Sequence, residues 1–184
     1  MNQLSVVAHT IFERFGGDKA MRFQEEDHFM FWAIAGCLGQ IVRDIFGYLV
    51  VMAGLVKSHI WNLAADLFFN GSVINTFGGL LIGALVNYVA AGSTGVITGL
   101  LLEWRGTKHY LFKGIGVTLL AWLFIFGLVV HSLPEVFKVH PQEPLDVFFS
   151  FLGHMILGAI TSWLITRFTG PAAQGERSLE RHDG

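Results

Sequence analysis

The sequence contains a single cysteine, Cys37, which lies inside a long apolar stretch. One cysteine cannot form a disulfide within the chain, and a metal site built on thiolates is not expected. The patterns HExxH, GxSxG and the phosphate-binding GxxxxGK followed by Ser or Thr are also absent, so no motif indicates a peptidase, a serine hydrolase or a nucleotide-binding loop. We therefore expect neither a metal site nor enzymatic activity.

Charge is also scarce. Charged residues make up 14% of the chain and hydrophobic residues 53%, with a mean hydropathy of +0.55, and such values are unusual for a soluble chain. The formal net charge of −2 argues against nucleic acid as a partner. Long apolar runs are abundant, and each meets the ~20 residues that a membrane-spanning helix needs. These runs cover about residues 29–56, 73–104, 110–133 and 147–168.

The sequence thus predicts an all-α integral membrane protein with a bundle of four transmembrane helices over residues 28–168, and the lipid bilayer is its expected partner. Basic residues indicate the orientation, because Lys and Arg in short loops stay on the cytoplasmic side. They gather at both ends of the chain and around the second loop, whereas segments 57–71 and 134–146 contain only Lys57 and Lys138. We expect both termini inside (N-in/C-in) and these two segments outside.

Three segments flank or connect the spans. Residues 1–27 are expected in the cytoplasm, where residues 4–15 form either an amphipathic helix on the membrane surface or a loosely ordered tail. Residues 169–184 are expected to be a polar cytoplasmic tail. Apolar residues recur at helical spacing over 58–70, which predicts a short helix in the outer interface with Trp61 among the lipid headgroups.

Small residues predict how the helices pack, because helices in lipid approach closely where side chains are small. The second span contains two GxxxG motifs, which makes it the expected centre of the bundle, and the fourth span offers a small surface of its own. We favour packing within the chain over dimerisation, although a homo-oligomer or a membrane-protein partner stays open. The candidate packing residues are Gly79, Gly83, Gly95, Gly99 and Gly158.

Adjacent ionisable residues, Arg43 and Asp44, stand near the middle of the first span. Each costs several kcal/mol in hydrocarbon unless it has a partner or water. At ~1.5 Å per residue, three other polar residues reach similar depths. The sequence predicts one buried polar cluster of Gln40, Arg43, Asp44, Asn87 and His154.

A haem site is a further possibility for a membrane helix bundle with eight histidines. Such a site needs two axial ligands at one level on facing helices. His131 lies near the outer end of the third span, whereas His154 lies several ångströms deeper on the fourth. His28 and His109 both lie at the inner boundary, where interfacial polar residues are ordinary. We expect no cofactor.

Two segments carry a resemblance to known families. The run over 39–46, with Arg43 and Asp44, resembles the first span of small four-span membrane proteins of Gram-positive bacteria. The pattern of His131, Pro134, a proline-bearing loop and then residues 151–154 is similar to the end of the bacterial YqhR-like and YagU-like inner-membrane proteins. The resemblance implies the four-span architecture and a bacterial inner membrane, but no particular reaction.

Three classes of function fit these observations. A structural or accessory membrane protein needs only a dry, closed bundle in which the buried polar residues fix helix register. A proton- or ion-conducting channel or transporter would use Arg43, Asp44 and His154 and would need a cavity that reaches them. A membrane enzyme would need titratable groups and a nucleophile in one cleft. We predict the accessory protein, with transport as the alternative.

Overall fold

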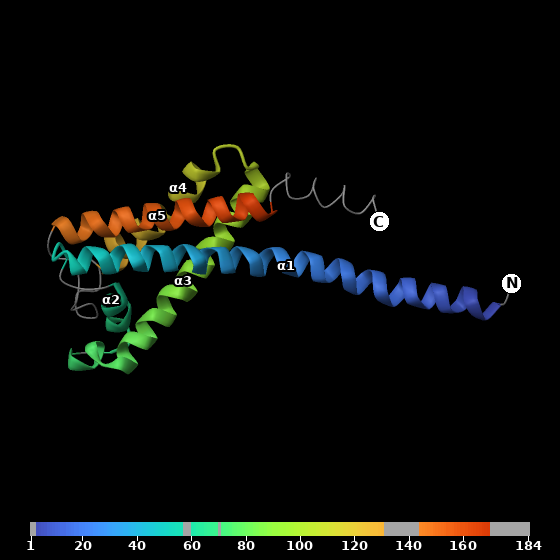
Figure 1. The fold of residues 1–184 in the computed structure, drawn as a ribbon, viewed down its shortest axis with the longest axis horizontal. Coiled ribbons are helices and arrows are strands. Elements are labelled where there is room, and N and C mark those ends of the chain that lie inside the picture. The colour runs from blue at the N-terminus through green and yellow to red at the C-terminus, as the bar shows by residue number, and fades with distance from the viewer. Residues whose placement is uncertain (1–2, 57–59, 70, 131–143, 170–184) are drawn as a thin grey trace.

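The computed structural model describes residues 3–56, 60–69, 71–130 and 144–169, and within these ranges the chain forms helices and no strands (Figure 1). Between the longer helices lie short helical segments, one of them a 3-10 helix. The elements in chain order are α1 (Gln3–Met52), α2 (Ile60–Asp66), η1 (Gly71–Asn75), α3 (Phe77–Arg105), α4 (Tyr110–Trp122), the π-helix η2 (Leu123–Val130) and α5 (Pro144–Thr169).

Four helical segments are long and apolar enough to cross a membrane, which confirms the predicted number. They are His28–Met52, Phe77–Arg105, Tyr110–Leu128 and Pro144–Thr169. The first apolar helix ends four residues before the predicted boundary at 56, and the second begins four residues after the predicted start at 73. The third changes from α-helix to π-helix at Leu123. The N-in/C-in orientation stays a prediction.

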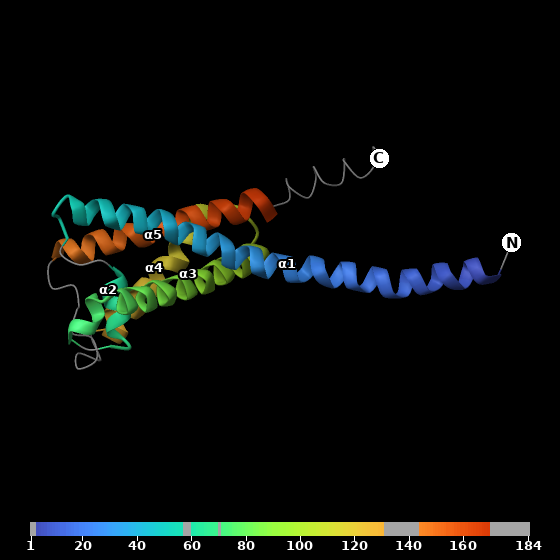
Figure 2. The same cartoon turned by 60° about the horizontal axis from the view of Figure 1, so that its bottom comes forward.

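The two ends of the chain differ in what the structure describes. α1 begins at Gln3 and runs without a break into the first span, so it extends well beyond the other helices (Figures 1 and 2). The helix predicted over 4–15 is therefore continuous with the span, while its location on the membrane surface stays a prediction. α5 ends at Thr169, and the tail 170–184 lies outside the described residues.

Local chemistry explains where the helices end. Gly54 and Gly106 adopt φ values of 72° and 74° after α1 and α3, a left-handed conformation that costs glycine little. Thr76 caps α3 by accepting a hydrogen bond from the backbone N–H of Gly79 at 3.2 Å. At the other end of α3, the Lys113 ammonium donates to the carbonyls of Arg105 and Gly106, where the helix dipole favours a cation.

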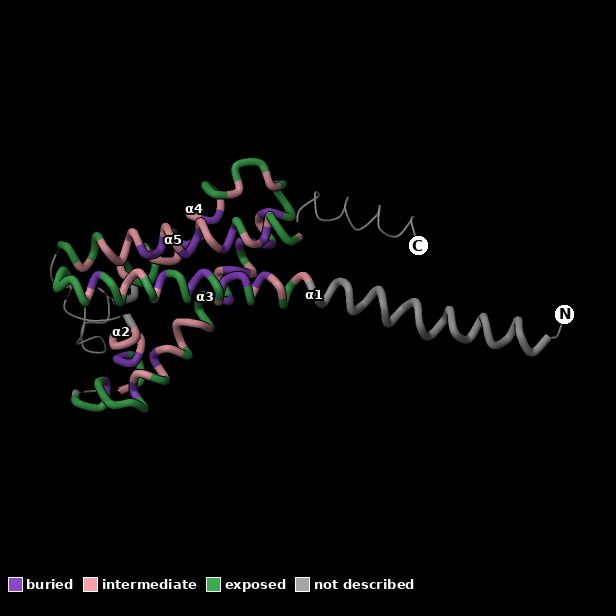
Figure 3. The backbone as a smooth tube through the Cα atoms, viewed as in Figure 1, coloured by how far each residue is buried: buried purple, intermediate pink, exposed green. Residues whose placement is uncertain are grey.

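Close approaches between small residues join the helices in the order α3, α1, α5, α4. α1 lies between α3 and α5, and α5 lies between α1 and α4, with the buried residues on the faces that meet (Figure 3). α3, the second span, also contacts α2, η1, α4 and α5, which agrees with its predicted place at the centre of the bundle. These approaches join Gly36 to Ala91, Gly39 to Thr161 and Gly114 to Gly158.

The five predicted packing glycines are all buried in contacts within the chain. Gly95 and Gly99 lie against α1, Gly79 and Gly83 lie against η1 and α2, and Gly158 lies against α4. At each of these positions an added Cβ would collide with a neighbouring backbone or ring. These contacts let the helix backbones approach one another closely.

The short helix predicted over 58–70 appears as α2, which packs on α3 where Gly83 meets the backbone carbonyl of Trp61. Leu63, Ala65 and Asp66 of α2 are buried. The half-buried indole of Trp61 turns toward α1 and donates to Oδ2 of Asp44 at 3.3 Å, a contact that the sequence analysis did not predict. The location of α2 in the outer interface stays a prediction.

Candidate functional site: a cavity beside a buried arginine

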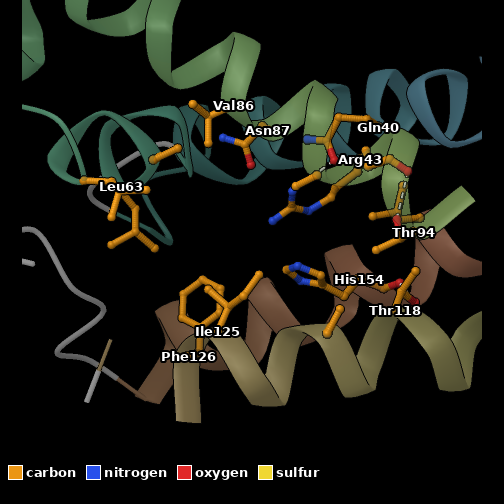
Figure 4. A pocket seen from close by; sticks show the side chains of 16 residues that line it. Gln40, Arg43, Leu63, Val86, Asn87, Thr94, Thr118, Ile125, Phe126 and His154 are labelled. Carbon is orange, nitrogen blue, oxygen red and sulfur yellow. Dashed lines mark hydrogen bonds between the residues drawn. The ribbon is translucent and has the colours of Figure 1, made fainter. Parts of the chain in front are cut away.

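A cavity of about 230 Å³ lies inside the bundle between α3 and α4, two helices that make few contacts with one another (Figure 4). All five α-helices contribute to its walls. The walls are apolar except for one polar region, and their largest apolar side chains belong to Leu63, Val86, Ile125 and Phe126. The polar region comprises Gln40, Arg43, Asn87, Thr94, Thr118 and His154.

Among the described residues that line this cavity, Arg43 is the only charged one. Its side chain is 6% exposed and passes over Gly153 of α5, where an added Cβ would stand 3.4 Å from its Cγ and Nε atoms. The sequence analysis missed Gly153, although a glycine directly before His154 was a signal that space is needed there. α1 and α5 thus hold the guanidinium group at the cavity.

Arg43 and Asp44 do not bond directly but are joined through Gln40. Nη1 of Arg43 donates to Oε1 of Gln40 at 3.1 Å, and Nε2 of Gln40 donates to Oδ1 of Asp44 at 2.7 Å. This arrangement follows from the helix, on which neighbours project about 100° apart whereas residues three or four apart share a face. With Trp61 on Oδ2, both carboxylate oxygens of Asp44 have a donor.

His154 faces Arg43 from the opposite wall (Figure 4). Its Nδ1 lies 2.7 Å from the backbone oxygen of Ser150, so Nδ1 carries the hydrogen and Nε2 keeps its lone pair in the neutral ring. The rings of Trp122 and Phe126 pack on the imidazole with centroids 6.4 and 6.1 Å away. The side chain is therefore fixed in orientation by α4 as well as by α5.

Asn87 lies in the same wall but outside the hydrogen-bonded chain. Its amide nitrogen donates to the backbone oxygen of Gly83 at 3.0 Å, one turn back on α3. The structure therefore unites Gln40, Arg43 and Asp44 in one chain of hydrogen bonds, and it places Asn87 and His154 around the cavity beside that chain. Asp44 itself does not line the cavity.

The electrostatic character of the site follows from the hydrogen-bonding capacity of arginine. A guanidinium group has five N–H donors, and Arg43 uses one of them on Gln40; among the described residues its remaining donors have no partner. No carboxylate lines the wall. The cavity thus combines apolar surface with unused donors on a cation, an arrangement that fits a molecule with one polar, electron-rich end.

Comparison with protein-family models, with curated proteins and with solved structures gives no match. The geometry of the cavity is therefore the basis for the function proposed below.

Proposed function

We propose that this chain is a multi-pass membrane protein of accessory type that binds a small, mainly apolar molecule inside its helix bundle. The observation that carries the proposal is the cavity of about 230 Å³, whose apolar wall is interrupted by the 6% exposed Arg43. Binding pockets for small molecules are typically apolar, with a few convergent polar groups that orient the ligand. The cavity between α3 and α4 has this composition.

The cavity also argues against a purely structural role for the polar cluster. A buried charge that only fixes helix register is stabilising when its hydrogen-bonding groups are satisfied within the protein. Arg43 satisfies one donor on Gln40 and directs its head group toward open space. A bound molecule would supply the acceptors that the described residues do not supply.

Proton or ion conduction through Arg43, Asp44 and His154 is the second candidate. The observation in its favour is that the cavity reaches Arg43 and His154. Its apolar walls offer a cation few oxygen ligands in place of its hydration shell, and the fixed charge of Arg43 repels cations. These properties rank conduction below the binding of an amphipathic molecule.

The test of binding uses the full chain in lipid nanodiscs and radiolabelled eight-carbon probes, octanoate and 1-octanol. We expect saturable retention of at least one probe above that of empty nanodiscs. Ala121→Phe, which fills the cavity from α4, should abolish this retention, whereas Leu120→Phe should not, because Leu120 is 69% exposed and outside the cavity wall. Retention that is absent, or equal in both variants, would overturn the proposal.

Conduction is tested in proteoliposomes that contain a pH-sensitive dye. Proton flux that both Asp44→Asn and His154→Ala abolish, in folded protein, would move conduction ahead of binding. Absence of flux across pH and membrane voltage would leave binding as the function of the site.

A further inference from the structure

We propose that the molecule bound in the cavity is a carboxylic acid with a medium-length alkyl chain, held between Arg43 and His154 together with one proton. This inference rests on the proposed function, since it names the ligand of the same cavity. Three properties of the site lead to it: the unused donors of Arg43, the free lone pair of His154 and the size and apolarity of the remaining space.

Arg43 favours an oxygen acid over other polar groups. The planar guanidinium group matches a carboxyl group with two parallel N–H···O bonds. The nearby carboxylate of Asp44 is not bonded to Arg43, because neighbours on a helix project about 100° apart and Arg43 donates to Gln40 instead. The residues that the structure describes in the wall of the cavity include no acidic side chain. An acid that enters the cavity therefore meets a buried cation with no competing anion in the wall.

His154 accounts for the proton. Its Nδ1–H is committed to Ser150, so its Nε2 accepts a hydrogen bond from the hydroxyl of a carboxylic acid, while Arg43 donates to the carbonyl oxygen. Transfer of that proton to Nε2 gives imidazolium and carboxylate. The site then holds the same number of protons as it does with the neutral acid and the neutral imidazole. Arg43 on α1 is the charged group that faces the ring, and the rings of Trp122 on α4 and Phe126 on η2 pack on it.

The charge of the filled site supports this proton count. Arg43 and Asp44 together are neutral, and they are connected through Gln40. A carboxylate without a proton would leave one net negative charge in a low-dielectric region, which is costly. A carboxylate that binds together with one proton adds no net charge.

The remaining space sets how much of the alkyl chain the cavity can enclose. At about 30 Å³ per water molecule, a cavity of about 230 Å³ corresponds to roughly eight waters, which suits a ligand of about ten non-hydrogen atoms such as octanoic acid. Val86 and Phe126 line the apolar part, and Leu67 and Ile125, 45% and 38% exposed, mark its open side. A lipid with two long acyl chains is far too large for this space.

The experiment compares octanoate, 1-octanol and octylamine, each at pH 7 in nanodiscs that contain the full chain. We expect octanoate to bind at least tenfold more tightly than octanol, and octylamine not to bind. Arg43→Gln should reduce octanoate affinity at least tenfold while octanol affinity changes little. Circular dichroism of the variant in nanodiscs checks that it is folded.

A second measurement needs no variant. Octanoate is ionised in solution at pH 7, as carboxyl side chains are, so binding should take up about one proton per molecule. Titration calorimetry in buffers of different ionisation enthalpy measures this uptake directly, and His154→Phe should remove it.

The outcomes separate the two proposals. Equal affinities for octanol and octanoate, with Ala121→Phe abolishing both, would overturn the acid while binding itself stands. Octanoate binding without proton uptake would overturn the role of His154 and with it this inference. Absence of saturable binding of any probe would overturn both proposals.

Discussion

The α1–α3 interface and the space between α3 and α4 show two ways in which one helix can face its neighbours. Along α1, Gly36 and Gly95 bring the backbones of the two helices into direct contact. Toward α4, α3 presents Val86, Asn87 and Ala90, and a cavity separates these residues from Thr118 and Ala121. Since lipid supplies little hydrophobic force between helices, the glycines of the first interface let the backbones meet, whereas the described residues that line the cavity include no glycine.

The polar cluster lies at the boundary between these two regions. Arg43 extends from α1 over Gly153 of α5 and ends at the cavity. Its hydrogen bond to Gln40 connects it to Asp44. The closely packed helices therefore hold a charged group in place, and the open side gives that group room for a ligand.

The largest effect is expected from Gly95→Leu, which inserts a side chain where an added Cβ already collides with the carbonyl of Trp32. We expect a loss of at least about 3 kcal/mol of unfolding free energy, because the backbones must separate. Gly116→Leu is the matched control, since nothing lies within 4 Å of a Cβ there, and it should stay within about 0.5 kcal/mol. Unfolding by SDS in mixed micelles measures both, and similar values would contradict the described α1–α3 contact.

The next effect concerns the chain of hydrogen bonds between Arg43 and Asp44. Asp44→Ala leaves Gln40 and Trp61 without an acceptor and Arg43 without its linked anion, and Arg43→Ala leaves the anion alone. The double substitution should cost about 2 kcal/mol less than the sum of the single ones, because the groups share one network. Additive or negligible effects on the unfolding free energy would show that the two residues act independently.

The helices themselves were predictable because each apolar run is long enough to span a bilayer, and four such helices are present. The link from Gln40 to Arg43 and Asp44 was also accessible, since residues three and four apart share a helix face. Helix neighbours were not accessible, because a GxxxG motif marks a face without naming its partner. The second span, which has two such motifs, contacts every other span, but the motifs did not tell which glycine meets which helix.

The other contacts that the sequence did not predict join residues on different helices. Trp61 reaches Asp44 from α2, and Gly153 lies under Arg43 from α5. Each contact depends on how a helix is rotated about its axis, which apolar composition alone leaves open because lipid-facing and buried residues are both hydrophobic. Asn87 was expected in the cluster because its depth is similar to that of Arg43, but its amide bonds to its own helix. Depth alone does not show whether a side chain bonds to its own helix or to a neighbouring one.

A smaller effect is expected from Trp61→Phe, which keeps the ring but removes the N–H that donates to Asp44 at 3.3 Å. The loss should be about 1 kcal/mol of unfolding free energy, the usual contribution of one hydrogen bond. Trp163→Phe is a suitable control because Trp163 is 47% exposed on α5, and it should change stability less. Equal losses would mean that the Trp61 hydrogen bond does not contribute to holding α2 on α1.

The smallest change in stability is expected from Gly153→Ala. Gly153 lies beside Arg43 at the cavity, whereas Gly95 lies in the α1–α3 interface, so the two substitutions compare a glycine in each region. The atoms nearest to a Cβ at Gly153 are Cγ and Nε of Arg43, at 3.4 Å, an ordinary van der Waals distance that the added methyl group can occupy. We expect unfolding free energy to change by no more than about 0.5 kcal/mol.

The added methyl group fills the space beside the Arg43 side chain and limits how far that side chain can adjust to a ligand, so octanoate affinity should fall by a few fold while octanol affinity stays constant. Binding assays in nanodiscs measure the affinities, and SDS titration measures the stability. A large loss of stability with unchanged octanoate affinity would place Gly153 among the helix-packing glycines. A change confined to octanoate affinity would instead make Gly153 a positioning residue for Arg43, since its lack of a side chain then sets where the charge lies.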